Sequence, residues 1–158
     1  MLTIISMEEY RVEESLGFLA NRLATAMRRS LEEKLKEYDL TAPQFGFMAI
    51  LFEEDGQPLS NIGRCIYCDK PTITGIANRL EKKGLINKIR DDKDRRVVKA
   101  VLTKKGKGFK DVLYKMAMEV NTGAAKGFPA EEVKLLKAQL RRSLDNVLGT
   151  IEGGVINV

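Results

Sequence analysis

The sequence predicts a mainly α-helical chain with one small β-hairpin in its middle. At both ends of the chain, apolar residues recur every three or four positions, which is typical of long amphipathic helices. In the middle, an amphipathic segment over residues 70–83 stops at Gly84. Two β-prone runs follow, 85–90 and 97–102, and the six charged residues 91–96 join them. A helix followed by such a hairpin has the layout of a winged helix-turn-helix.

The first helix is expected over residues 10–38, where the apolar positions make one stripe. The chain then breaks, and Thr41 as N-cap with Pro43 in the first turn begins a second helix that runs to about Phe52. Residues 53–58 are expected to form a turn. The stripe of the first helix consists of Leu16, Leu19, Leu23, Met27, Leu31 and Leu35.

A short third helix is expected over residues 60–66, followed by a tight corner before the amphipathic segment. After the hairpin, Thr103 is expected to cap a fifth helix that ends near Gly123. Gly106 and Gly108 weaken its first turn, because glycine is a poor helix former.

The last helix is expected to open at residues 128–132, where a proline and two acids suit a helix start, and to end at residues 153–154. Its apolar stripe consists of Val133, Leu136, Leu140, Leu144 and Val147.

Composition excludes several classes of protein. The chain has 158 residues, 31% charged and 44% hydrophobic, as in soluble globular proteins. No apolar run approaches the roughly 20 residues of a membrane span, and the start is too short for a signal peptide. We therefore expect a cytoplasmic protein without a membrane partner, whose translation starts at Met1 or Met7. Histidine is absent, and no phosphate-binding loop, nucleophile elbow or metal motif occurs, so no enzyme activity, cofactor or metal is expected.

Positive charge is concentrated in the middle of the chain. Residues 59–110 hold 15 Lys/Arg and 5 Asp/Glu, a net charge of +10, whereas the remainder holds 12 basic and 17 acidic residues. A basic centre with acidic flanks is the electrostatic pattern of a protein that binds a polyanion. Because the excess spans both the amphipathic helix and the hairpin, we expect double-stranded DNA as the partner.

The helix over residues 70–83 has two different faces. At about 100° per residue, Ile73, Ile76, Ala77 and Leu80 share the face that must point to the core. The other positions carry groups that contact phosphates or bases, such as threonine hydroxyls, an asparagine that can read adenine and an arginine that can read guanine. The DNA-binding residues expected on this helix are Lys70, Pro71, Thr72, Thr74, Gly75, Asn78, Arg79 and Lys82.

The hairpin loop supplies the remaining candidates, Asp94, Arg95 and Arg96. Asp94 and Arg96 are separated by one residue, so both side chains can lie on the same side of the loop. A carboxylate in that position can hold a guanidinium in a bidentate geometry. The held arginine would then enter a narrow, negatively charged minor groove.

Three long helices at the chain ends carry more apolar surface than a centre of about 65 residues can bury. The surplus is best explained by a partner copy, and a symmetric homodimer would place two recognition helices about one DNA turn apart. We therefore expect an N-terminal dimerisation helix at 1–38, a DNA-binding domain at 39–103 and C-terminal dimerisation helices at 104–158.

Three segments together resemble the MarR family of dimeric winged-helix transcriptional regulators. They are LT-x-PQF at 40–45, LSNIGRCIYCDKPTITGIANRLEKKGLI at 59–86 and DDKDRRVVKAVLTKKG at 91–106. The resemblance implies a homodimer, usually a repressor, that binds an inverted repeat and is often released by a small molecule or an oxidant. Gly75 stands where many members carry a larger residue, which puts base reading at that position in question.

The resemblance also implies an effector cleft between the dimerisation and DNA-binding parts. An aromatic or phenolic small molecule is the expected effector. The candidate cleft residues are Arg22, Tyr38, Phe45, Phe47 and Tyr114, all of which are also ordinary core or surface residues.

Cys65 and Cys68 form a CxxC pair in the expected third helix and the corner after it. A thioredoxin-like motif would follow a strand, and zinc would normally need four Cys/His ligands. Core packing is the favoured interpretation, because free cysteine behaves as a small hydrophobe. A thiol-based redox switch is the alternative.

Two other functions compete with a sequence-specific regulator. An architectural, weakly specific DNA-binding protein is disfavoured by the polar, hydrogen-bonding face of the helix over residues 70–83. A protein-interaction module that reuses the winged helix without DNA is disfavoured by the +10 charge of the centre.

Overall fold

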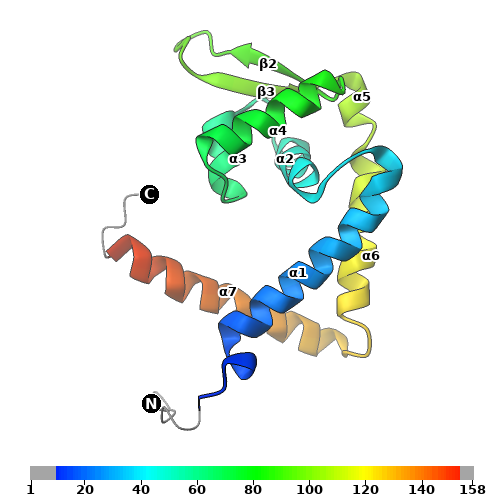
Figure 1. Ribbon diagram of the computed structural model, residues 1–158, viewed down its shortest axis with the longest axis vertical. Coiled ribbons are helices and arrows are strands. Elements are labelled where there is room, and N and C mark those ends of the chain that lie inside the picture. The colour runs from blue at the N-terminus through cyan, green and yellow to red at the C-terminus, as the bar shows by residue number, and fades with distance from the viewer. Residues whose placement is uncertain (1–9, 154–158) are drawn as a thin grey trace. The chain divides into compact units, whose positions relative to one another are not determined.

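The computed structural model describes residues 10–153, which form two compact units, one extending to Val120 and the other beginning at Asn121 (Figure 1). The chain is mainly helical with one small antiparallel sheet, as predicted. The candidate starts Met1 and Met7 lie outside the described residues. The helices are η1 (Val12–Glu14), α1 (Leu16–Leu35), η2 (Lys36–Tyr38), α2 (Ala42–Glu53), α3 (Leu59–Cys65), α4 (Lys70–Lys82), α5 (Lys104–Lys107), α6 (Lys110–Ala124) and α7 (Ala130–Gly153), and the strands are β1 (Gln57–Pro58), β2 (Ile86–Arg90) and β3 (Val98–Leu102).

The first α-helix is shorter than predicted. The chain at Ser15 is extended, and the Ser15 hydroxyl accepts a hydrogen bond from the Phe18 N–H at 3.3 Å, so Ser15 is the N-cap. The residues before it make the single 3-10 turn η1 instead of a helix from residue 10. At the other end α1 tightens into η2 and stops at Asp39, whose φ of 52° lies in the left-handed region.

The start of α2 is as predicted. The Thr41 hydroxyl accepts from the Gln44 N–H at 3.4 Å, and the Gln44 side chain accepts from the Thr41 N–H at 3.2 Å. This capping box satisfies two backbone donors that a helix start leaves without partners. Pro43 fits the first turn because its missing N–H would have no helical acceptor there.

The sheet has three strands in the order β1-β3-β2, all antiparallel, where the sequence predicted a two-stranded hairpin. The segment expected to be a turn contributes β1, whose Gln57 is paired with Ala100. Asp55 secures this edge, because its carboxylate accepts from the Leu102 N–H at 2.8 Å and the Gly56 N–H at 2.9 Å. The prediction missed β1 because two residues carry no periodicity of their own.

The core of the larger unit lies between α2, α3, α4 and the sheet, and the end of α1 and the first half of α6 also contribute to it (Figure 1). The predicted inward face of α4 is confirmed, with Ile73, Ile76, Ala77 and Leu80 each no more than 4% exposed. Burial of one such leucine or isoleucine side chain stabilises the fold by roughly 1.5–3 kcal/mol. The outward face of α4 is therefore fixed by the packing of its inner face.

The predicted fifth helix is divided into α5 and α6. The Thr103 hydroxyl accepts from the Gly106 N–H at 3.0 Å, which confirms Thr103 as the N-cap. The first helical piece ends at Lys107, and a new helix begins at Lys110. Gly106 is required here because a Cβ atom would collide with the Leu85 carbonyl oxygen.

In the smaller unit, α7 keeps its apolar stripe on the surface. Leu136, Leu140, Leu144 and Val147 are 40–58% exposed. Within residues 10–153, none of the helices combines the length and hydrophobicity needed to cross a bilayer.

Candidate nucleic-acid interface

The outward face of α4 begins at a well-capped helix start. The Asp69 carboxylate accepts a hydrogen bond from the Thr72 N–H at 2.8 Å. Hydrogen bonds from Thr72 hold the pKa of Asp69 below its ordinary value, so the cap stays ionised. Pro71 occupies the first turn, where it costs no helical hydrogen bond.

The expected DNA-binding residues of α4 lie on its surface. All are exposed except Gly75, which is half-buried and has open space where a side chain would project. The Thr74 hydroxyl donates to the Lys70 carbonyl oxygen at 2.7 Å, so only its lone pairs remain for another partner. The exposed members are Lys70, Pro71, Thr72, Thr74, Asn78, Arg79 and Lys82.

The wing tip holds Arg96 as the spacing predicted. Arg96 Nε lies 3.1 Å from Asp94 Oδ1, Arg96 Nη2 lies 3.4 Å from Asp94 Oδ2, and the Arg96 backbone N–H also donates to Oδ1 at 3.0 Å. These bonds, the side-chain one foremost, hold the pKa of Asp94 below its ordinary value. The Arg96 side chain is nevertheless 91% exposed, so the carboxylate orients the guanidinium without covering it.

Asp91 organises the rest of the loop. Its Oδ1 accepts from the backbone N–H groups of Lys93 and Asp94 at 2.9 and 3.0 Å, while its Oδ2 pairs with Lys99 Nζ at 2.5 Å. The bond from Lys99, with those from the backbone, lowers the pKa of Asp91 to about 2. Arg95, by contrast, is exposed, and its carbonyl oxygen accepts from Arg90 Nη1 at 2.6 Å.

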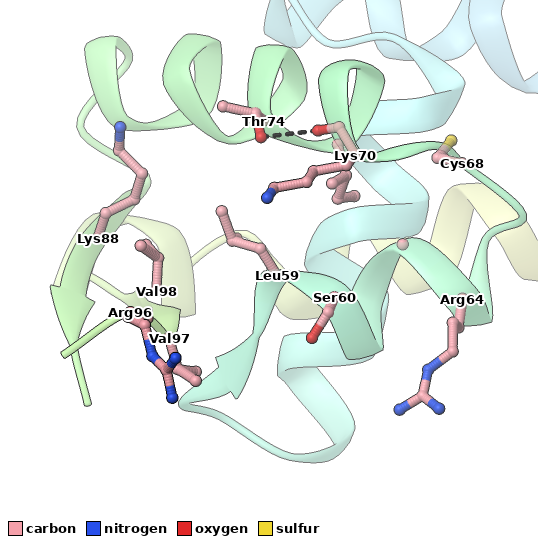
Figure 2. A pocket seen from close by; sticks show the side chains of 12 residues that line it. Leu59, Ser60, Arg64, Cys68, Lys70, Thr74, Lys88, Arg96, Val97 and Val98 are labelled. Atoms are coloured by element: carbon pink, nitrogen blue, oxygen red, sulfur yellow. Dashed lines mark hydrogen bonds between the residues drawn. The ribbon is translucent and has the colours of Figure 1, made fainter. Parts of the chain in front are cut away.

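A groove of about 490 Å³ separates α4 from the wing (Figure 2). Lys70 extends into it, and Lys88 extends from β2 towards α4 at one end. Arg96 lies at the wing side and Arg64 at the opposite end. Its floor is apolar and includes Leu59. The other lining residues are Ser60, Gly63, Cys68, Ile73, Thr74, Val97 and Val98.

Sequence reasoning missed Arg64 and Lys88 as groove residues. Both belong to the basic centre, but their place beside the outward face of α4 depends on how α3 and β2 pack. Lys88 Nζ also donates to Asn78 Oδ1 at 2.5 Å and pairs with Glu81 Oε2 at 3.1 Å.

The five expected effector residues lie in different surroundings. Tyr38 lines a pocket of about 240 Å³ together with Lys34, Lys115 and Glu119. Its ring meets Phe109 edge-on, with ring centroids 5.8 Å apart.

The other four have contacts of their own. Phe47 is fully buried in the core, and Phe45 packs half-buried against it. The Tyr114 hydroxyl donates to Glu53, which raises the pKa of Tyr114 to about 12. Arg22 lies over the Phe18 ring, 5.7 Å from its centroid.

The two cysteines are free thiols with different exposure. Cys68 is half-buried against the core and its Sγ lies 3.7 Å from the Ile66 carbonyl oxygen. Cys65 is exposed, so the packing interpretation is wrong for it: the last turn of α3 points this residue outward. Among residues 10–153, no cluster of three or more Cys, Asp and Glu side chains could hold a metal ion.

The described winged helix corresponds to a known family. The MarR family profile matches residues 40–98, from just before α2 to the start of β3. This part of the chain, which contains the winged helix, is therefore similar to the MarR family. Its relatives are transcriptional regulators, and one similar solved structure is bound to DNA.

Two curated relatives show how far the similarity extends along the chain. The HTH-type transcriptional regulator TtmR of Methylorubrum extorquens is 34% identical over 63% of the chain, which spans about half (51%) of that relative's length. The organic hydroperoxide resistance transcriptional regulator of Bacillus subtilis is 27% identical over 91% of this chain, and the match covers 94% of that regulator's length.

Solved structures extend the similarity beyond the winged helix. A MarR transcriptional regulator from Methanosarcina mazei is 25% identical, with a TM-score of 0.82 over 86% of this chain and 98% of that one. The structure of reduced AbfR bound to DNA is 25% identical, with a TM-score of 0.72 over 91% of this chain and 99% of that one. The MarR fold therefore accounts for most of the chain.

Proposed function

We propose that this protein is a cytoplasmic, sequence-specific repressor of the MarR family that binds a pseudopalindromic operator as a homodimer and is released by an aromatic or phenolic small molecule. The observation that carries the proposal is the wing, where Asp94 holds an almost fully exposed Arg96 at one end of the cationic groove. An oriented guanidinium at that place matches the negative potential of a narrow minor groove.

The groove beside α4 suits one sugar-phosphate strand of the duplex. If α4 enters the major groove and the wing tip the next minor groove, the strand that separates them must pass between helix and wing. The cations Arg64, Lys70 and Lys88 line that space. Neutralised phosphates release counterions, so binding should weaken steeply with salt.

Two apolar helix faces support a homodimer. On α1, Leu16, Leu19 and Leu23 are 43–78% exposed. The stripe of α7 is likewise exposed along most of that helix. Apolar surface of this extent on long helices is characteristic of an interface between copies.

An effector pocket at Tyr38 is the structural basis for proposing release by a small molecule. It combines an aromatic ring with the ammonium groups of Lys34 and Lys115 and the carboxylates of Glu37 and Glu119. Lys34 is paired with Glu119 at 2.6 Å, and the charge of Lys115 also lowers the pKa of Glu119. A phenolate or aromatic carboxylate would complement this set of groups.

Footprinting on the genomic fragments that flank the gene tests the proposal. We expect protection of one inverted repeat, with its half-sites about one helical turn apart. Phenolic compounds should remove this protection, and Tyr38→Ala should make them less effective. Equal binding to every fragment without a protected repeat would instead indicate an architectural DNA-binding protein.

Redox control is a second candidate function, because the Cys65 thiol is exposed three residues from the half-buried Cys68 and α4 follows directly. A double Cys65→Ser, Cys68→Ser variant should bind DNA as the wild type does. Peroxide should then release the wild type only, with recovery after thiol treatment. Release of both proteins, or of neither, would exclude this candidate.

A further inference from the structure

Asn78 lies on the exposed face of α4, and a residue of the sheet already engages its amide. Lys88 of β2 extends its side chain towards α4 (Figure 2), and its Nζ donates a hydrogen bond of 2.5 Å to Asn78 Oδ1. The same ammonium pairs with Glu81 Oε2 at 3.1 Å. The Lys88 backbone N–H donates to Glu81 Oε1 at 2.9 Å. Both the backbone and the side chain of Lys88 therefore connect β2 to α4.

The chemistry of Lys88 fixes the orientation of the Asn78 amide. An ammonium group has three N–H donors and no acceptor, so the Asn78 atom that it meets must be the carbonyl oxygen. The amide NH₂ is left to face another partner. The oxygen keeps a second lone pair, but that lone pair lies beside a positive charge.

The purines differ in what they offer to such a pair of groups. In the major groove, adenine presents the N7 acceptor and the N6 amino donor, whereas guanine presents two acceptors, N7 and O6. An adenine amino group that approached Asn78 Oδ1 would bring its partly positive hydrogens next to the Lys88 ammonium. Guanine would meet the Asn78 NH₂ with an acceptor, and the nearby cation would attract its O6.

We propose that Lys88 is a positioning residue that makes Asn78 a hydrogen-bond donor, so that each half-site carries guanine in preference to adenine where Asn78 meets the major groove. This preference differs from the adenine reading that asparagine alone suggests. It rests on the proposed operator binding and names one determinant of operator sequence.

The test is a binding selection on randomised duplexes, followed by competition measurements on the selected operator with the full chain. Asn78→Ala identifies the contacted base pair, because the preference at that pair alone should disappear. Lys88→Met keeps the aliphatic stem and the backbone bond to Glu81 but removes the ammonium. It should shift the guanine-to-adenine ratio at that pair towards adenine by on the order of tenfold.

Lys82→Met is the matched control, since it removes one exposed cation from the same helix. It should weaken binding to all sequences without a change at any one base pair. Asn78→Asp offers a second measurement that leaves Lys88 in place: an acceptor replaces the donor, so the preference for guanine should be lost. Circular dichroism verifies that each variant is folded.

The outcomes separate this inference from the proposed function. A wild type that selects no operator would overturn the proposal of sequence-specific binding. If the wild type selects an operator but Lys88→Met behaves as Lys82→Met does, or Asn78→Asp keeps the guanine, Lys88 does not set the specificity of Asn78. If Asn78→Ala changes no base pair, Asn78 does not read the operator.

Discussion

The winged helix and the terminal helices use apolar residues in opposite ways. In the centre, Leu80 and its neighbours on α4 are buried within the same chain. In the first half of α1 and along α7, leucines at the same helical spacing remain largely on the surface, whereas Leu35 at the end of α1 is buried. The core thus closes within one chain, with Leu35 of α1 and Leu113 of α6 among its buried members, whereas the exposed stripes support the proposed homodimer.

Truncation of one leucine in each region tests this difference and should give the largest effect. Leu80→Ala should lower the free energy of unfolding by about 2–5 kcal/mol, because it leaves a cavity in the core. Leu140→Ala makes the same chemical change on a side chain that is 47% exposed, so it should weaken the proposed dimer and leave the free energy of unfolding nearly unchanged. The dissociation constant of the dimer should rise about tenfold.

Urea unfolding measures the first quantity and sedimentation the second. If Leu140→Ala and Leu144→Ala both dimerise as tightly as the wild type does, the exposed stripe of α7 is not the interface. A Leu80→Ala protein with unchanged stability would contradict the core described for the centre.

Two substitutions in the wing test the winged helix through its binding to DNA. Arg96→Ala should weaken operator binding by about 1–3 kcal/mol, as expected when a positioned arginine contact is lost. Asp94→Ala should weaken it too, although the substitution removes a negative charge next to a polyanion. Fluorescence anisotropy on the operator, with Lys126→Ala as a control at an exposed cation outside the interface, measures both. Tighter binding by Asp94→Ala would mean that the wing acts through its positive charge alone and that Asp94 does not orient Arg96.

Strong acid should loosen the wing. The pKa of Asp91 is about 2 in the folded protein, below its ordinary 3.8. Asp91 therefore stabilises the folded wing above about pH 3.8, and this contribution is lost as the pH falls through 2. Amide NMR signals of Lys93 and Asp94 should report this transition, and Asp91→Asn should abolish it. A midpoint near the ordinary value would contradict the Lys99 pairing.

Lys93→Ala should give the smallest effect. Lys93 is exposed at the wing tip, where only its backbone N–H has a described hydrogen bond. We expect a few tenths of a kcal/mol, equal for all sequences, with a slightly shallower salt dependence. A base-specific loss in the anisotropy assay would assign Lys93 a direct role in reading the operator.

The sequence predicted well the features that depend on neighbouring residues. The Thr41 cap, the inward face of α4 and the Asp94–Arg96 pair are all local, so residue type and spacing suffice for them. The same local reasoning placed the start of α1 six residues too early, because the Ser15 cap begins the helix at Leu16 and not at residue 10.

Features that join distant segments were not predictable in this way. The edge strand β1 exists because Gln57 pairs with Ala100, 43 residues later in the numbering. Lys88 reaches Asn78 only because β2 returns along α4. Cys65 is exposed because α3 ends at that residue, which its small, apolar side chain did not indicate.

The hydrogen bonds between Arg96 and Asp94 also affect the entropic cost of DNA binding by the wing. Freezing a flexible side chain on binding costs about 0.5–1.5 kcal/mol, and Arg96 meets this entropic cost when the protein folds. Its guanidinium therefore arrives already ordered and does not adapt to the shape that it encounters. On the proposed binding to DNA, the wing tip would therefore report the width of the minor groove, and would be sensitive to base pairs that no side chain touches.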